Sequence, residues 1–165
     1  MRAVGYRTST DVYFLDAPPE RVWALVADPT VVEELVAHGV TFEPPLGGPV
    51  STGDTWVEVH GAECDDDRVP WTAVEARAPE LLRLHGWQSG MRQESTYELS
   101  PHDGGTMLRT RLTLTPTLRG RSKERPLTWL LFAVGVLGWM VAREPDLVKQ
   151  NLPARLRAAD GPLSA

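Results

Sequence analysis

The order of apolar and polar residues predicts a strand and two short helices at the start of the chain. Residues 8–15, TSTDVYFL, are rich in β-branched and aromatic side chains, which is typical of a strand. Residues 20–27 then show apolar side chains at helical spacing, after two prolines that suit a first helical turn. Thr30 can cap a second short helix over residues 31–37.

From residue 40 onward the apolar residues recur with a period of two, which indicates strands. Short runs of turn-forming residues, namely CDDD, RAPE, SG and PHDGG, separate the strand-like segments as an antiparallel meander requires. The run Asp103-Gly104-Gly105 is the strongest hairpin signal. The expected strands are residues 40–43, 55–60, 69–77, 81–88, 92–99 and 106–115.

The C-terminal part is dominated by Leu127–Ala142, which carries no charged residue. A membrane-spanning helix needs about 20 apolar residues, so this run is too short for one. We expect a long helix that closes over the sheet, interrupted at Pro145 and Pro153. Two alternatives stay open for the same run: a homodimer interface, and contact with a membrane surface.

Composition narrows the class of protein. A length of 165 residues suits a single domain over residues 1–165, and the mixture of helices and strands predicts an α+β fold. The net charge of −5 argues against nucleic acid as a partner. Cys64 is the only cysteine, so no internal disulfide can form, and the N-terminus shows no secretory signal. A cytoplasmic protein is expected.

Strand alternation predicts which side chains face the closing helix. In the last strand the leucines occupy one face and Arg109 and Arg111 the other, so the leucines should point inward. The same alternation predicts further inward residues in the other strands, namely Val57, Val59, Thr72, Val74, Ala76, Leu82, Leu84, Tyr97 and Leu99. The predicted ligand-binding residues are Val57, Val59, Val74, Leu84, Tyr97, Leu112, Leu131 and Val134.

The opposite face of the middle strands carries an unusual mixture of aromatic, acidic and histidine residues. Its members are Trp56, Glu58, His60, Val69, Trp71, His85 and Trp87. Three interpretations remain open: an outer face with amphipathic aromatics, a polar and aromatic pocket if these strands turn inward, or a subunit contact.

Candidate chemistry is sparse. The four histidines are scattered one to a segment and there are no paired cysteines, so no metal site is predicted. The chain lacks the glycine-rich motifs that hold phosphates, and no cofactor is expected. General acid or base catalysis would have to come from the candidates His60, Glu58 or Tyr97.

Three segments carry a resemblance to a known superfamily: FLDAPPERVWALVADP, PWTAVEARAPELLRLHGW and LSPHDGGTMLRTRLTLTP. They resemble the polyketide cyclase/START-like proteins, also called the SRPBCC, helix-grip or plant-allergen-like superfamily. The motif positions are Ala17, Pro18, Val22 and Trp23 after the first strand, and Gly104, Gly105 and Thr106 before the last. The resemblance implies a seven-stranded curved antiparallel sheet wrapped on a long C-terminal helix, with two short helices after strand 1.

The resemblance implies a function class and no particular ligand, because such proteins include lipid carriers, hormone receptors and aromatase/cyclases. We expect binding of a small hydrophobic or aromatic molecule in an internal cavity, for transport or sensing, by a bacterial-type protein. One alternative is an aromatase/cyclase-like or dehydratase-like enzyme acting on a polyketide-type substrate. The other is an interaction module that pairs with itself or with a membrane surface through Leu127–Ala142.

Overall fold

The computed structural model describes residues 7–31, 40–60, 68–88, 91–116 and 151–157. Residues 151–157 are helical, as are residues 29–31 at the predicted second helix. The remainder of that helix, the run Leu127–Ala142 and the candidates Leu131 and Val134 lie outside the described residues. The named elements are β1 (Arg7–Leu15), α1 (Pro19–Val26), β2 (Val40–Glu43), β3 (Thr55–His60), β4 (Arg68–Arg77), β5 (Leu81–Gln88), β6 (Met91–His102) and β7 (Gly105–Pro116).

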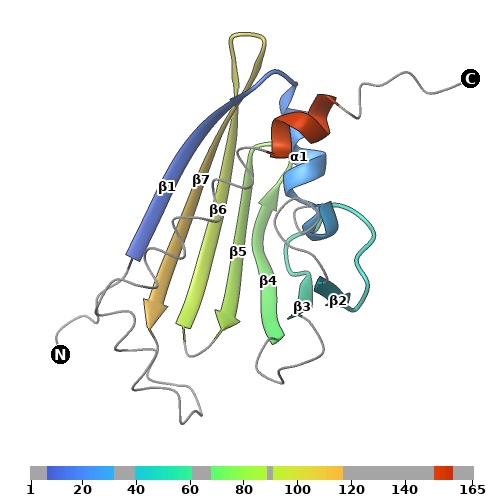
Figure 1. Ribbon diagram of the computed structural model, residues 1–165, viewed down its shortest axis with the longest axis vertical. Helices are drawn as coiled ribbons and strands as arrows, with labels where there is room; N and C mark the ends of the chain where they lie inside the picture. The colour runs from blue at the N-terminus through green and yellow to red at the C-terminus, as the bar shows by residue number, and fades with distance from the viewer. Residues whose placement is uncertain (1–6, 32–39, 61–67, 89–90, 117–150, 158–165) are drawn as a thin grey trace, which may run out of the picture.

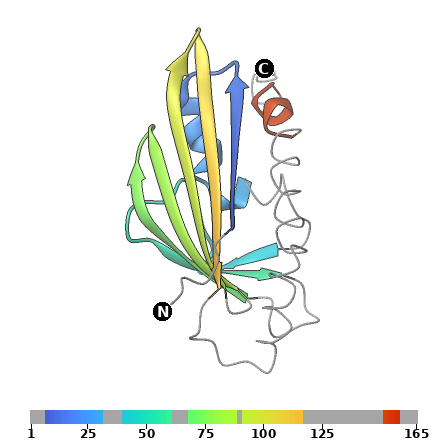
Figure 2. The ribbon, with the colours of Figure 1, turned by 90° about the vertical axis from the view of Figure 1, so that its left-hand side faces the viewer.

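All seven strands join one antiparallel sheet in the order β1-β7-β6-β5-β4-β3-β2. Successive strands from β2 to β7 are neighbours, and β1 returns to pair with β7 (Figure 1). The sheet is strongly curved, with β2 and β3 crossing the direction of the long strands (Figure 2). The α+β class, the seven strands and the antiparallel meander are confirmed.

The β6–β7 hairpin forms where the sequence predicts it. His102 pairs with Gly105, and the two residues between them have positive φ, 44° at Asp103 and 82° at Gly104. That combination is typical of a type I′ turn, which matches the right-handed twist of the strands. Just beyond it, the buried Thr106 Oγ1 donates a hydrogen bond of 2.6 Å to the carbonyl of Ala17. This bond ties the start of β7 to the connection between β1 and α1.

One face of the sheet, here called the inner face, carries the main hydrophobic core. From α1, Val22, Trp23 and Val26 are buried in this core together with side chains of β1, β6 and β7. Leu152 and Leu156, one helical turn apart, join the same cluster. Arg21 Nη2 also donates a hydrogen bond of 3.0 Å to the Leu156 carbonyl, which places residues 151–157 beside α1 at one end of the sheet (Figure 1).

A β-bulge in β4 changes which side chains face inward. Ala73 pairs with Leu84 and Glu75 pairs with Arg83, so one extra residue, Val74, lies between two successive pairs. Alternation is therefore interrupted there. Ala76 faces inward beyond the bulge, and before it the inward positions are Ala73, Trp71 and Val69.

Because of the bulge, part of the inner face differs from the prediction. Because Trp71 pairs with Trp56, and Val69 with Glu58, the inward residues of β3 are Trp56 and Glu58. Val57, Val59 and Thr72 consequently lie on the opposite, outer face, and Val74 is 37% exposed at the bulge itself. Their predicted inward orientation is wrong, because the bulge breaks the alternation along β4. The inward orientation of the other predicted residues is confirmed for Leu82, Leu84, Tyr97, Leu99, Leu108, Leu112 and Leu114.

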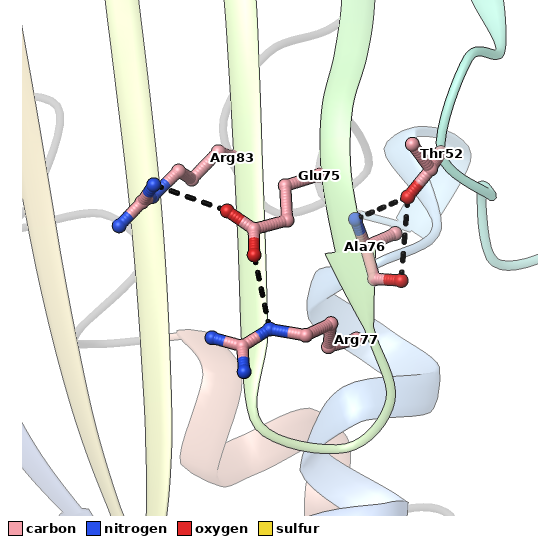
Figure 3. Close-up of polar contacts among 5 residues, drawn as sticks. All are labelled: Thr52, Glu75, Ala76, Arg77 and Arg83. Carbon is pink, nitrogen blue, oxygen red and sulfur yellow. Dashed lines mark hydrogen bonds and ion pairs between the residues drawn. The ribbon is translucent and has the colours of Figure 1, made fainter.

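The loop before β3 holds the bulge in place. Gly53 N–H donates to the Ala73 carbonyl at 2.8 Å, and Ala73 N–H donates to the Asp54 carbonyl at 2.9 Å. Thr52 Oγ1 accepts a hydrogen bond of 2.8 Å from Ala76 N–H (Figure 3). On the outer side, the Glu75 carboxylate bridges Arg77 and Arg83, each at 3.0 Å (Figure 3). Backbone groups that the irregular ladder would leave unpaired thus find partners.

We predict that Thr52→Val lowers the free energy of unfolding by about 1 kcal/mol, because valine keeps the shape but leaves the Ala76 N–H without its acceptor. Urea denaturation measures the change. Thr52→Ser retains the hydroxyl and should stay close to the wild type. Equal stability of the valine and serine variants would contradict this role for Thr52.

Candidate functional site

Five polar side chains interrupt the apolar inner face near its middle. We call them the inner polar patch: Ser9, Asp11, Gln93, Ser95 and Thr110. They are close together because Thr110 pairs with Asp11 on one side and Tyr97 on the other. Ser9 Oγ donates a hydrogen bond of 3.2 Å to Asp11 Oδ2. All five are partly exposed, although they share the face that carries the core.

The inner polar patch separates two hydrophobic clusters. The main core lies toward α1, and a smaller cluster of Met91 and Leu114, with Leu112 against it, lies toward the other end of the strands. Burying polar groups in a sealed core costs free energy, so a partly exposed polar patch between apolar clusters is typical of a binding surface. Three predicted ligand-binding residues, Leu84, Tyr97 and Leu112, lie beside this patch and are partly exposed.

A second polar feature of the inner face joins β3 to β4. Trp71 Nε1 donates a hydrogen bond of 2.7 Å to Glu58 Oε2, and both side chains are partly buried. Phe42 pairs directly with Glu58, and Trp56 pairs with Trp71, so three aromatic residues neighbour Glu58 on this face. We call these four residues the aromatic–acid corner. Of the unusual set noted in the sequence, Trp56, Glu58, Val69 and Trp71 face inward.

Gly86 makes room for the corner. It pairs with Trp71, and a methyl group added at Gly86 would lie 2.7 Å from the Trp71 ring carbon Cε3. The six-membered part of the indole therefore covers the glycine backbone on the inner face. Glycine is required because of this close approach between ring and backbone.

The catalytic candidates are not brought together. Glu58 lies on β3 and Tyr97 on β6, three strand positions apart in the sheet. At the usual strand spacing this is about 14 Å, which is too far for both groups to act on one bond. His60 ends β3, where it pairs with Val40, and its side chain lies outside the described residues.

His85 and Trp87 lie on the outer face, since the inward residues of β5 are Leu84 and Gly86. Burial lowers the pKa of His85 from its usual value of 6.5, and the nearby charge of Arg92 lowers it further. His85 Nε2 is 3.8 Å from Glu94 Oε1, which would favour the charged ring. Arg92 Nη2 contacts that same carboxylate oxygen, so the attraction of Glu94 for His85 is offset.

The described residues form neither a cluster of metal ligands nor a helix of membrane-spanning length. Within the described ranges, His, Cys, Asp and Glu form no group of three that could hold a metal ion. No helix among the described residues is long and apolar enough to cross a membrane.

Sequence reasoning missed the inner polar patch, although a signal for it existed. Asp11 alternates with the buried Tyr13 and Leu15 in β1, and Ser95 alternates with Leu99 in β6. Extending the inward positions along each whole strand would have found them.

The family of the chain follows from comparison with known proteins. Residues 7–152 match the protein family described as polyketide cyclase / dehydrase and lipid transport, so the chain belongs to that family. A comparison with curated protein sequences found no match.

Solved structures share the fold at low sequence identity. The Mll3558 protein from Rhizobium loti is 16% identical with a TM-score of 0.60, over 93% of this chain and 99% of that one. Ara h 8.0201 is 12% identical with a TM-score of 0.51, over 84% and 100%. Truncated norcoclaurine synthase from Thalictrum flavum is 9% identical with a TM-score of 0.52, over 83% and 96%. These similarities establish the helix-grip fold.

Gly86→Ala should destabilise the protein by about 1–3 kcal/mol, because the added methyl group displaces the Trp71 ring. The direction of this change is informative, since replacing glycine by alanine inside a strand ordinarily stabilises a protein by about 0.5–1 kcal/mol. Urea denaturation gives the difference. Gly47→Ala is the matched control, because nothing lies within 4 Å of the added atom. A Gly86→Ala variant as stable as the wild type would contradict the close contact.

The lowered pKa of His85 predicts a pH dependence of stability. The folded protein favours the neutral ring, so the contribution of His85 is present above pH 6.5 and is lost as the pH falls through the folded-state pKa. His85→Gln should therefore reduce the loss of unfolding free energy between about pH 7 and about pH 5. Denaturation at both pH values tests this, and an unchanged loss in the variant would refute it.

Proposed function

We propose that this protein binds a small hydrophobic or aromatic molecule in an internal cavity on the inner face of its sheet, for transport or sensing. The observation that carries the proposal is the inner polar patch, which lies partly exposed between two hydrophobic clusters. Apolar walls would supply most of the affinity through the area that they remove from water. The polar groups would fix the orientation of the ligand.

The predicted residues Leu84, Tyr97 and Leu112 supply the apolar and aromatic contacts in this proposal. Leu84 and Leu112 both pair with Ser95, so a polar side chain lies between two apolar ones across neighbouring strands. This alternation suits a ligand with a mainly apolar body and few polar groups. The family description, which includes lipid transport, is consistent with such a ligand.

Binding is favoured here over concerted catalysis. Glu58 and Tyr97 are separated by three strand positions, so each would have to act alone on a substrate. A cyclase could still work by holding a reactive chain in one conformation. That alternative would use the same inner face.

The test uses the neutral fluorescent dye N-phenyl-1-naphthylamine and two neighbouring positions of β6. Ser95→Trp places a large side chain on the inner face, whereas Thr96→Trp places it on the outer face, between Arg83 and Arg111. We expect the inner variant to weaken dye binding by about tenfold or more, and the outer variant to leave it unchanged.

Circular dichroism and thermal unfolding verify that both variants are folded. If Ser95→Trp does not fold, Ser95→Leu makes a smaller change at the same position and should also lower the affinity for the dye. Wild-type protein that fails to bind the dye, or equal effects of the inner and outer variants, would overturn the proposal.

A further inference from the structure

We propose that Asp11 determines the specificity of the inner polar patch, so that the preferred ligand donates a hydrogen bond from its polar end and carries no negative charge. A hydroxyl group and an ammonium group share this property, whereas a carboxylate lacks it. The inference rests on the proposed function and adds the chemical class of the ligand. It follows from the position of Asp11, its hydrogen bonding and the charges of the inner face.

Asp11 lies on the inner face although it is an acidic residue. It alternates with Tyr13 along β1, so both side chains share the face that carries the main core. Tyr13 is buried, whereas Asp11, two residues earlier, is only partly buried. Because burying a carboxylate without a partner is costly, a sealed core would not tolerate it here. Asp11 therefore lies where the sealed core ends and the partly exposed part of the inner face begins.

The carboxylate of Asp11 is oriented and retains acceptor capacity. Ser9 Oγ donates to Asp11 Oδ2 at 3.2 Å, and the residues that the structure describes give Asp11 no further hydrogen bond or ion pair. A carboxylate offers about four acceptor sites on its two oxygens, so sites remain for a ligand. Thr110, directly opposite on β7, adds a hydroxyl that can donate or accept. A ligand hydroxyl or ammonium group between them would donate to Asp11.

The charges of the inner face disfavour an anionic ligand. Between residues 8 and 115, no inner-face strand side chain that the structure describes is a lysine or an arginine. The nearest basic residues of β7, Arg109 and Arg111, lie on the outer face. A ligand carboxylate beside Asp11 would meet a like charge without a basic partner from this set, which is costly. The anion of a fatty acid or an aromatic acid is therefore disfavoured at the inner polar patch.

A structural role for Asp11 is the competing explanation. β1 ends the strand order, and an inward-pointing charge on an edge strand can prevent pairing with a second chain. That role does not account for Ser95 and Thr110, which lie on the interior strands β6 and β7 and continue the polar patch away from the edge. The polar patch as a whole is thus better matched to a ligand than to edge protection.

The test compares four probes that share one aromatic skeleton and compete with N-phenyl-1-naphthylamine. They are 1-naphthalenemethanol, which donates and accepts, its methyl ether, which only accepts, the cationic 1-naphthylmethylamine and the anionic 1-naphthoate. The proteins are the wild type, Asp11→Leu, Asp11→Asn and Glu98→Gln. Leucine removes the acceptor and the charge, whereas asparagine removes only the charge. Glu98 lies on the outer face, with Oε2 3.7 Å from Arg109 Nη1, so Glu98→Gln controls for net charge.

We expect the ratio of alcohol affinity to ether affinity to fall about fivefold in Asp11→Leu, because the acceptor is lost, and to persist in Glu98→Gln. The affinity for naphthoate should rise about tenfold in Asp11→Asn, because a like charge is removed. In the wild type, tighter binding of the amine than of the alcohol would identify ammonium as the preferred donor, and the reverse order would identify hydroxyl.

Circular dichroism verifies that the variants are folded, and Asp11→Asn, which keeps the shape of the side chain, preserves the test if Asp11→Leu does not fold. If both Asp11 variants keep the wild-type affinity ratios, or if no probe displaces bound dye, the inference fails and the proposed function stands. Unchanged ratios together with dimerisation of Asp11→Leu in size-exclusion chromatography would assign Asp11 to edge protection instead. If the wild type does not bind the dye, both the inference and the proposed function fail.

Discussion

The extra residue in β4, between Ala73 and Glu75, determines what the inner face of this sheet contains. Without it, alternation from Ala76 would direct Thr72 and Val74 inward and leave Trp71 outside. With it, Trp71 and Val69 face inward, and strand pairing carries the change to Trp56 and Glu58 on β3. The bulge interrupts the ladder of backbone hydrogen bonds. The loop before β3 compensates, because its backbone and the Thr52 side chain form hydrogen bonds with β4 on both sides of the bulge.

The inner face consists of a sealed apolar part and a partly exposed part that carries polar side chains. At one end, α1 and residues 151–157 seal a core around Trp23, Leu152 and Leu156. Farther along the strands, the inner polar patch and the aromatic–acid corner remain partly exposed. A sheet built only for stability would gain from apolar residues at these inner positions. We propose that these polar groups orient a ligand, and membership of the family described as polyketide cyclase / dehydrase and lipid transport is consistent with that proposal.

Sequence reasoning succeeded where local signals decide the outcome. The bounds of β2, β3 and β5 are as predicted, because turn formers delimit strands whose alternation is regular. The inward orientation of Leu84, Tyr97 and Leu112 was predicted correctly for the same reason. The orientation of Val57, Val59 and Val74 did not, because the bulge depends on hydrogen bonds from residues 52–54, some twenty positions earlier in the chain. The hydrogen bond between Glu58 and Trp71 depends on that same bulge, so no local pattern could reveal it.

The most direct test of this account follows the indole N–H resonances of the six tryptophans by two-dimensional NMR during titration with N-phenyl-1-naphthylamine. Trp71→Phe and Trp87→Phe assign the two informative signals, one from each face of the sheet. A ligand on the inner face should shift the Trp71 signal, whose N–H is bonded to Glu58, and leave the 47% exposed Trp87 unchanged. A shift of Trp87 with an unmoved Trp71 would contradict the assignment of the inner face as the binding site.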